Sequence, residues 1–173
     1  KTQIPHRSRI NAALAWLYRT DMGFSGNREQ IYVSGHSAGG HQTAMLLNTD
    51  WENEYGLPAD IIKGGLSISG LFDLRPLRYS WLQPKLLLTH DVIQQQSPQF
   101  HIPDSAPPLM MTVGGEEPAE FLRQSNDYHL AWTAKGLAGN YKPLAGKNHF
   151  SAIDGFLDPD SELMGMLNTL SNR

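Results

Sequence analysis

The sequence predicts an α/β fold: a mostly parallel sheet flanked by helices. Two observations carry this prediction. Short apolar, strand-like runs alternate with segments of helical periodicity along the 173 residues, which is the pattern of strand–helix–strand units. A Gly-His-Ser-Ala-Gly-Gly segment also follows one of the apolar runs and opens a helical stretch. Because a chain of this length suits about one domain, residues 1–173 are expected to form a single domain.

The expected elements follow the alternation of apolar runs and helical patterns. In chain order they are a helix at 7–19, a strand at 30–34, a helix at 41–47, strands at 64–69 and 108–113, a helix ending near 135, a strand at 140–144 and a C-terminal helix. In the first helix, Ile10, Leu14 and Leu17 share one face. The last helix is expected to start at Asp158 and Pro159, a cap followed by a proline at the first helical position.

Residues 75–107 break this alternation. The segment is rich in proline and is predicted to be a loop-rich insertion, either a cap over the substrate pocket or a surface connection that only covers the end of the sheet.

The glycine-rich segment is typical of a nucleophile elbow, a sharp strand-to-helix turn that exposes a serine above the sheet. Ser37 is the candidate nucleophile. Gly35, Gly39 and Gly40 flank it, and a Cβ at Gly35 or Gly39 is expected to collide where strand and helix cross. The alternative is a glycine-rich turn in which Ser37 only caps the helix. His36 is a candidate pocket residue, although a packed histidine fits the same position.

An elbow serine needs a base and an acid, and in this kind of fold both follow it, with the histidine last. His149, the last histidine in the chain, lies in a polar loop after the final strand and is the candidate base. Glu117, at the turn that ends the 108–113 strand, is the candidate acid. Since Glu117 precedes Pro118, it could instead be a helix-start residue. Glu116 and Asp73 remain alternative acids.

At this point the chain resembles the α/β-hydrolase fold, in its esterase/lipase branch. The segments 69–77, 117–125 and 148–150 are similar to the kynurenine formamidase (arylformamidase) group and its esterase relatives. The resemblance implies that Ser37 is the nucleophile, Glu117 the acid and His149 the base, although members of that group usually carry aspartate at the acid position. It also implies an oxyanion hole formed by the Ala38 N–H and a second donor from a loop upstream in the fold.

The family motif for that second donor is absent from this sequence. The resemblance therefore implies the C-terminal part of the fold, without its first strands. The nucleophile strand would then be an open edge, so completion by N-terminal residues, a partner chain or a second copy of the chain is expected.

The activity implied by the resemblance is cleavage of a carboxylic ester or aryl formamide through an acyl-enzyme on Ser37. A carboxylesterase acting on acetylated or feruloylated sugars is the alternative enzyme. A non-catalytic binding module with the same fold is the alternative from another class, but it would not need a serine, a histidine and an acid in this order.

Bulk properties restrict the partners. The net charge is −3 with no run of basic residues, so neither nucleic acid nor a membrane surface is an expected partner. The chain has no cysteine, and no apolar stretch reaches the ~20 residues that span a bilayer. A cytoplasmic location is expected by default. His36 and His41 are wrongly spaced for a helical zinc site, so no metal and no cofactor is expected.

Overall fold

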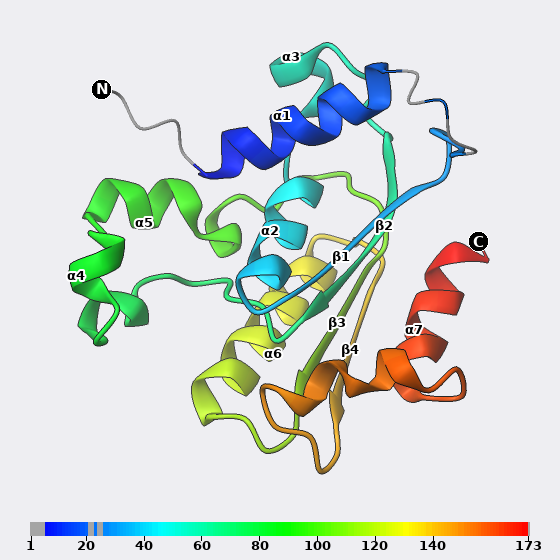
Figure 1. Cartoon of the computed structure of the whole chain (residues 1–173). Coiled ribbons are helices and arrows are strands. Elements are labelled where there is room, and N and C mark those ends of the chain that lie inside the picture. Colours follow the sequence, from blue (N-terminus) through cyan, green and yellow to red (C-terminus); the bar gives the residue numbers. More distant parts are fainter. Residues whose placement is uncertain (1–5, 21–22, 24–25, 173) are drawn as a thin grey trace.

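The structure is a computed structural model of the chain that describes residues 6–20, 23 and 26–172. Its centre is a sheet of four parallel strands in the order β1-β2-β3-β4 (Figure 1). The strands are β1 (Ile31–His36), β2 (Ile62–Ile68), β3 (Leu109–Gly114) and β4 (Gly139–Leu144). Because all four run the same way, their carboxyl ends lie at one edge of the sheet. The predicted α/β fold with a parallel sheet is confirmed.

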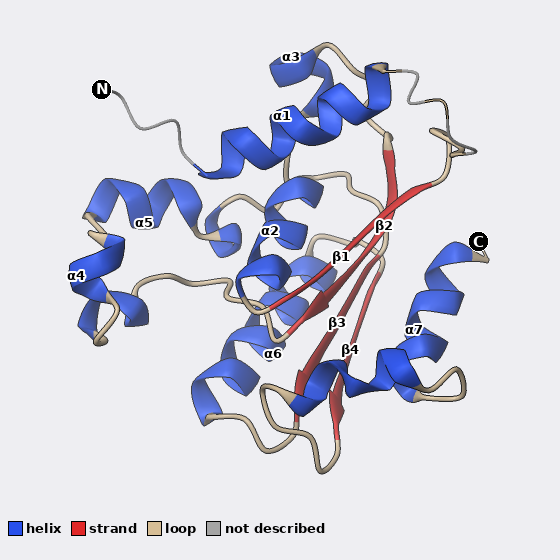
Figure 2. Ribbon diagram, viewed as in Figure 1, coloured by secondary structure: helices blue, strands red, loops and turns tan. Residues whose placement is uncertain are grey.

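Helices cover both faces of this sheet (Figure 2). The α-helices are α1 (His6–Arg19), α2 (Ala38–Leu47), α3 (Trp51–Tyr55), α4 (Gln83–Leu86), α5 (His90–Gln96), α6 (Ala119–Ala134) and α7 (Glu162–Ser171). Three short 3₁₀ helices are η1 (Pro76–Tyr79), η2 (Pro98–Phe100) and η3 (Ser151–Leu157). Helices α2 and α6 pack on one face with α1 outside α2, while α7 and η3 cover the other face.

The strands differ in how far they are buried. Every residue of β3 is buried, as expected for an inner strand of a parallel sheet. In β1 no residue is fully buried, and Ser34 is exposed. Among the described residues no strand pairs with the outer edge of β1. The strand that leads to Ser37 is therefore one of the two edge strands of the sheet in the described part of the chain.

Residues 75–107 contain η1, α4, α5 and η2 rather than loop alone. The segment, green in Figure 1, lies beside α2. Two side chains at α2 form hydrogen bonds with backbone carbonyls of the segment. His41 Nε2 lies 2.7 Å from the Gln96 carbonyl, and Asn48 Nδ2 donates to the Pro98 carbonyl at 3.1 Å. A covering role over the site stays a prediction.

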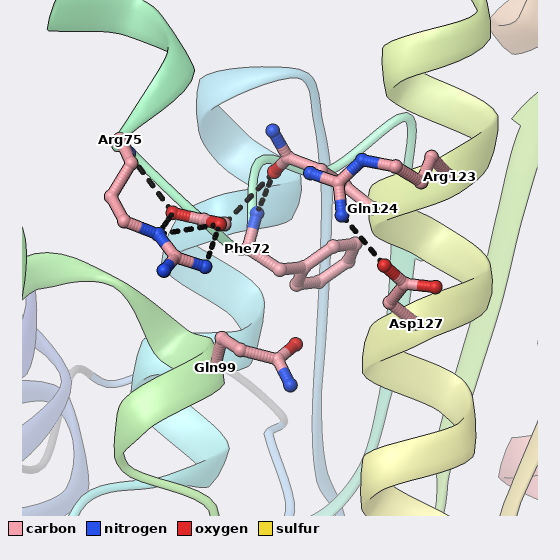
Figure 3. Close-up of a pocket in the computed structure, with 7 residues that line it drawn as sticks. Phe72, Arg75, Gln99, Arg123, Gln124 and Asp127 are labelled. Carbon is pink, nitrogen blue, oxygen red and sulfur yellow. Dashed lines mark hydrogen bonds and ion pairs between the residues drawn. The ribbon is translucent and has the colours of Figure 1, made fainter.

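A small polar cavity lies between the loop after β2 and α6 (Figure 3). Its volume is about 100 Å³, and its walls are Phe72, Asp73, Arg75, Gln99, Arg123, Gln124 and Asp127. The charged side chains are already paired with one another, Arg75 with Asp73 and Arg123 with Asp127. Ion pairs within the chain therefore line the cavity.

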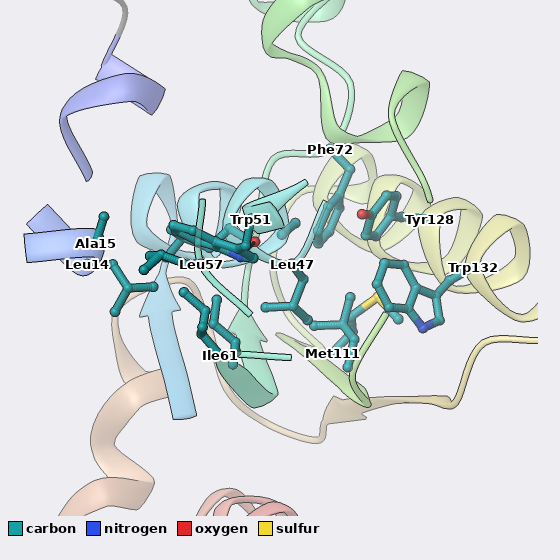
Figure 4. Close-up of a cluster of buried hydrophobic side chains, with 14 residues drawn as sticks. Leu14, Ala15, Leu47, Trp51, Leu57, Ile61, Phe72, Met111, Tyr128 and Trp132 are labelled. Carbon is teal, nitrogen blue, oxygen red and sulfur yellow. Dashed lines mark hydrogen bonds between the residues drawn. The ribbon is translucent and has the colours of Figure 1, made fainter. Parts of the chain in front are cut away.

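The main core lies between the sheet and the helices of the α2 face (Figure 4). Phe72 and Tyr128 stack with ring centroids 4.3 Å apart, and Trp132 follows one helical turn later on α6. All three side chains are essentially buried. Aromatic side chains of this size contribute much of the buried apolar area, so α6 is firmly fixed against β3, the strand that leads into its first turn.

The face of α1 that carries Ile10, Leu14 and Leu17 is only partly buried. Among the residues of α1 whose side chains the structure describes, Asn11, Leu14 and Ala15 are buried, while Ile10 and Leu17 are exposed. The helix packs on α2, and Asn11 Nδ2 donates to Thr49 Oγ1 at 2.9 Å in the turn after α2, so the side of α1 that carries Asn11 faces inward.

The final helix also starts later than expected, at Glu162. Ser161 Oγ accepts from the Met164 N–H and is its cap. Asp158 instead closes a turn by accepting from the Asp160 N–H. Because Ser161 rather than Asp158 caps the helix, the helix begins a few residues after its predicted start.

None of the helices in the described part of the chain has the length and apolar character that crossing a membrane requires.

Candidate active site

Ser37 alone forms the turn between β1 and α2, since β1 ends at His36 and α2 begins at Ala38. Its backbone has φ 57° and ψ −116°, a conformation that L-residues rarely adopt. The Ser37 N–H donates to the Ile68 carbonyl at 2.8 Å, which ties the turn to the end of β2. Strained backbone of this kind is what a nucleophile elbow requires.

The glycines of the turn have different roles. A Cβ on Gly35 would lie 2.3 Å from the Gly39 carbonyl oxygen, so the predicted collision at Gly35 is confirmed. The predicted collision at Gly39 is wrong, because a Cβ there would meet no atom within 4 Å. The second close approach is at Gly40, whose Cβ would lie 2.8 Å from the Ile68 carbonyl oxygen. Gly40 is the helical residue that faces the end of β2.

The structure brings Ser37, His149 and Glu117 into one hydrogen-bonded row. His149 Nε2 lies 3.1 Å from Ser37 Oγ, and His149 Nδ1 lies 2.7 Å from Glu117 Oε2. Because a carboxylate only accepts, Nδ1 carries the proton, which leaves Nε2 free to accept from the Ser37 hydroxyl. These three residues come from the ends of β1, β3 and β4, which meet at the carboxyl edge of the sheet.

The carboxylate of Glu117 is held from both sides. Its side chain is fully buried, and its second oxygen, Oε1, accepts from Ser69 Oγ at 2.5 Å and from the Gly114 N–H at 2.8 Å. Every oxygen of this buried carboxylate therefore has a donor, which compensates the loss of water around it.

The other two candidate acids lie elsewhere. Glu116 is exposed, and its N–H donates to the Lys147 carbonyl. Asp73 forms an ion pair with Arg75 in the cavity beside α6. Glu117 does not serve as a helix-start residue either, since α6 begins at Ala119 and Pro118 holds the capping position. Only Glu117 contacts the histidine.

His36 contacts the histidine loop. Its Nε2 lies 2.8 Å from the His149 carbonyl oxygen, and the two imidazole rings are 4.6 Å apart. Since a carbonyl only accepts, His36 donates from Nε2. Burial and the neighbouring His149 lower the pKa of His36 below its usual value, which keeps this ring neutral beside the candidate base. The structure thus places His36 as a support of the loop.

Aromatic rings surround the candidate base. Phe121, in the first turn of α6, lies 4.8 Å from the His149 ring, and Phe150 meets it edge-on at 5.8 Å. Phe150 is 81% exposed, and the His149 side chain itself is about a quarter exposed. The base is therefore accessible from solvent beside an apolar surface.

The backbone N–H of Ala38 belongs to the first turn of α2. The first N–H groups of a helix have no carbonyl partner within it and lie at the positive end of the helix dipole. The family resemblance assigns this N–H to the oxyanion hole, and that role stays a prediction.

Two contacts of the acid were not anticipated, those from Ser69 and Gly114. The Ser-Gly pair at 69–70, directly after a buried strand, was a signal available in the sequence. It could not reveal a bond between residues 48 positions apart.

Among the described residues no group of three or more histidine, aspartate or glutamate side chains is arranged to hold a metal ion.

Comparison with known proteins gives both sequence and structural relatives. No protein-family model matches the chain. The kynurenine formamidase of Danio rerio is 31% identical over 142 residues, which are 79% of this chain and 48% of that protein. The crystal structure of a protein from a Silicibacter species, assigned as a thioesterase, is 27% identical, with a TM-score of 0.71, over 96% of this chain and 59% of that one.

An esterase from Pyrobaculum calidifontis shares the fold at 17% identity, with a TM-score of 0.69, over 96% of this chain and 60% of that one. The chain spans about half the length of the kynurenine formamidases it matches.

Proposed function

We propose that this chain, which has the α/β-hydrolase fold and is related in sequence to kynurenine formamidases, carries the catalytic residues of a serine hydrolase. The observation that carries the proposal is the row Ser37–His149–Glu117, with 3.1 Å and 2.7 Å between the bonded atoms. The proposed substrate is a carboxylic ester or an aryl formamide. The formamide is favoured by the sequence relatives and the ester by the fold neighbours.

In the proposed reaction, the Ser37 oxygen attacks the substrate carbonyl as its proton passes to His149 Nε2. Glu117 accepts a hydrogen bond from Nδ1 of the imidazolium and so holds it in place. The Ala38 N–H donates to the oxyanion. His149 then gives the proton to the leaving alcohol or amine, and an acyl- or formyl-enzyme remains on Ser37. Water activated by the same histidine attacks this ester, which releases the acid and restores the serine.

We also propose that the site is completed by residues outside this sequence. Within the described residues β1 has a free edge, although it carries the nucleophile. Exposed strand edges attract a further strand, and the matched solved structures are considerably longer than this chain. A strand on that edge, from the same polypeptide or a partner chain, would bring the loop with the second oxyanion donor. Loss of one such donor costs about 10²–10³ in rate.

The test uses the longest natural polypeptide that contains this chain and a fluorophosphonate probe, which modifies activated serines. We expect covalent labelling of the wild type and none of Ser37→Ala, with Ser125→Ala as the control. Ser125 is a buried serine on α6 without a role in the row. If the wild type folds but is not labelled, the binding-module alternative replaces the hydrolase proposal.

Substrate class is tested on the same polypeptide without the probe, because a modified Ser37 can no longer react. Rates of hydrolysis of N-formylkynurenine, p-nitrophenyl acetate, a feruloylated sugar and a short thioester are compared as kcat/KM. A preference for the formamide supports the formamidase reading. A preference for the feruloylated sugar would favour the alternative carboxylesterase, because discrimination is the ratio of kcat/KM values.

A further inference from the structure

Ser69 combines two unusual properties at the end of β2. Its backbone is left-handed, with φ 51°, and its side chain is completely buried. Left-handed backbone is strained for any residue with a Cβ, and glycine is the usual occupant. In the described part of the chain, only Ser37, Ser69 and Leu87 are non-glycine residues with positive φ. Two of these three belong to the same hydrogen-bonded group.

The strained backbone directs the Ser69 hydroxyl at the acid. Ser69 Oγ donates to Glu117 Oε1 at 2.5 Å, while the Ser69 N–H donates to the Thr112 carbonyl at 2.7 Å. Thr112 lies on β3, the strand that leads to Glu117. Ser69 is therefore fixed to the same strand as the carboxylate that it contacts.

The contact determines how the carboxylate is turned. With Oε1 held by Ser69 and by the Gly114 N–H, the remaining oxygen, Oε2, faces His149 Nδ1. Rotation of the carboxylate would break both bonds to Oε1 together. A glutamate has one more rotatable bond than an aspartate, so a second donor restricts a freedom that the shorter acid would not have.

We propose that Ser69 is a positioning residue, which uses its strained backbone to hold the Glu117 carboxylate in line with His149. This inference rests on the proposed function, and it adds a fourth side chain to the row. A glycine at position 69 would relieve the backbone strain, but it would not supply the hydroxyl that holds the Glu117 carboxylate.

The test is a pair of substitutions that distinguish the effect of losing the hydroxyl from the effect of relieving the backbone strain. Ser69→Gly removes the hydroxyl and relieves the strain, whereas Ser69→Ala removes the hydroxyl and keeps the strain. We expect both variants to lose about tenfold or more in kcat with KM within about twofold, as for an interaction made only in the transition state. Thermal stability should separate them, with Ser69→Gly melting at or above the wild-type Tm and Ser69→Ala below it.

A spectroscopic readout accompanies the kinetics. The proton between His149 Nδ1 and Glu117 Oε2 should give a low-field proton NMR signal, which we expect to shift or broaden in both Ser69 variants. Ser125→Ala is the matched control, because Ser125 is also fully buried and its hydroxyl has no hydrogen-bond partner among the residues that the structure describes. Its kcat and its low-field signal should stay at wild-type values.

Two results would overturn the inference. Wild-type kcat in Ser69→Gly would show that the hydroxyl is dispensable, and loss of kcat in Ser69→Ala alone would assign the effect to backbone strain. Both results differ from failure of the proposed function itself. That failure appears in the wild type, as an absence of labelling at Ser37.

Discussion

Glu117 and Asp73 are two carboxylates that follow neighbouring strands, and the structure uses them differently. Glu117 follows β3 and is fully buried, with one oxygen occupied by Ser69 and Gly114 and the other facing His149. Asp73 follows β2 and gives both oxygens to Arg75, whose Nε and Nη2 bind it as a fork (Figure 3). A carboxylate that orients a histidine needs one oxygen available to accept from the imidazole. A carboxylate whose two oxygens both accept from an arginine can only hold its loop in place.

The largest effect on activity is expected when the buried carboxylate of Glu117 is neutralised. We expect Glu117→Gln to lower kcat/KM about 10³–10⁴-fold, because the amide no longer stabilises the imidazolium and can impose the wrong tautomer on His149. Steady-state kinetics on the longest natural polypeptide measures the effect. Asp73→Asn is the matched control and should change kcat/KM by less than about twofold, like other substitutions away from reacting groups. Equal losses in the two variants would contradict the assignment of Glu117.

The three turns that form the candidate site could be predicted from the sequence. The turn at Ser37, the loop of His149 and the acid turn at Glu117 each have a local signature, in which glycines and polar residues follow an apolar strand. Parallel strands then bring these turns to one edge. The choice of Glu117 over Asp73 remained open, because both follow strands, and only the tertiary contacts of Arg75 and His149 distinguish them.

Other features had no local signature. The bond from Ser69 to Glu117 joins residues 48 positions apart, and the left-handed backbone of Ser69 is set by the tertiary structure. The close approach at Gly40 rather than Gly39 depends on which side of α2 faces β2. The exposed face of α1 depends on its contact with α2. Hydrophobic periodicity predicts where a helix or strand lies in the sequence. The rotation of that element about its axis and its contacts depend on neighbours distant in sequence.

A smaller change tests the reach of the acid. Glu117→Asp keeps the charge but shortens the side chain by one methylene, so the carboxylate cannot meet His149, Ser69 and Gly114 at once. We expect a loss of about 10–10² in kcat, the size seen when a catalytic group is misplaced by about 1 Å. The same kinetic assay measures it. Wild-type activity in Glu117→Asp would indicate that the loop adjusts to the shorter acid.

Substitution of Asp73 should change the stability of the fold rather than the activity. We expect Asp73→Asn to lower the free energy of unfolding by about 1 kcal/mol, since Arg75 loses the mostly buried carboxylate that it pairs with, whereas an exposed pair contributes less. Asp127→Asn is the control, because Asp127 pairs with Arg123 on the surface of α6, where both side chains are nearly half exposed. Its effect should be at most about 0.5 kcal/mol. Urea unfolding measures both, and a larger effect at Asp127 would contradict the role given to Asp73.

The smallest predicted effect is the pH dependence of this difference. Burial on its own raises the pKa of Asp73, but the hydrogen bonds and the charge of Arg75, with Arg123 nearby, outweigh it, so the pKa is lowered in the folded protein. A folded pKa below the unfolded one, near 4, stabilises the fold above that pH, and the stabilisation is lost as the pH falls through the folded value. The advantage of the wild type over Asp73→Asn should therefore be constant from about pH 7 to 5 and shrink below about pH 4. Urea unfolding of both proteins at pH 7, 5, 4 and 3 measures it. An advantage that grew with acidity would mean that the carboxyl of Asp73 is protonated more easily in the fold than in the unfolded chain, which the arginine contacts oppose.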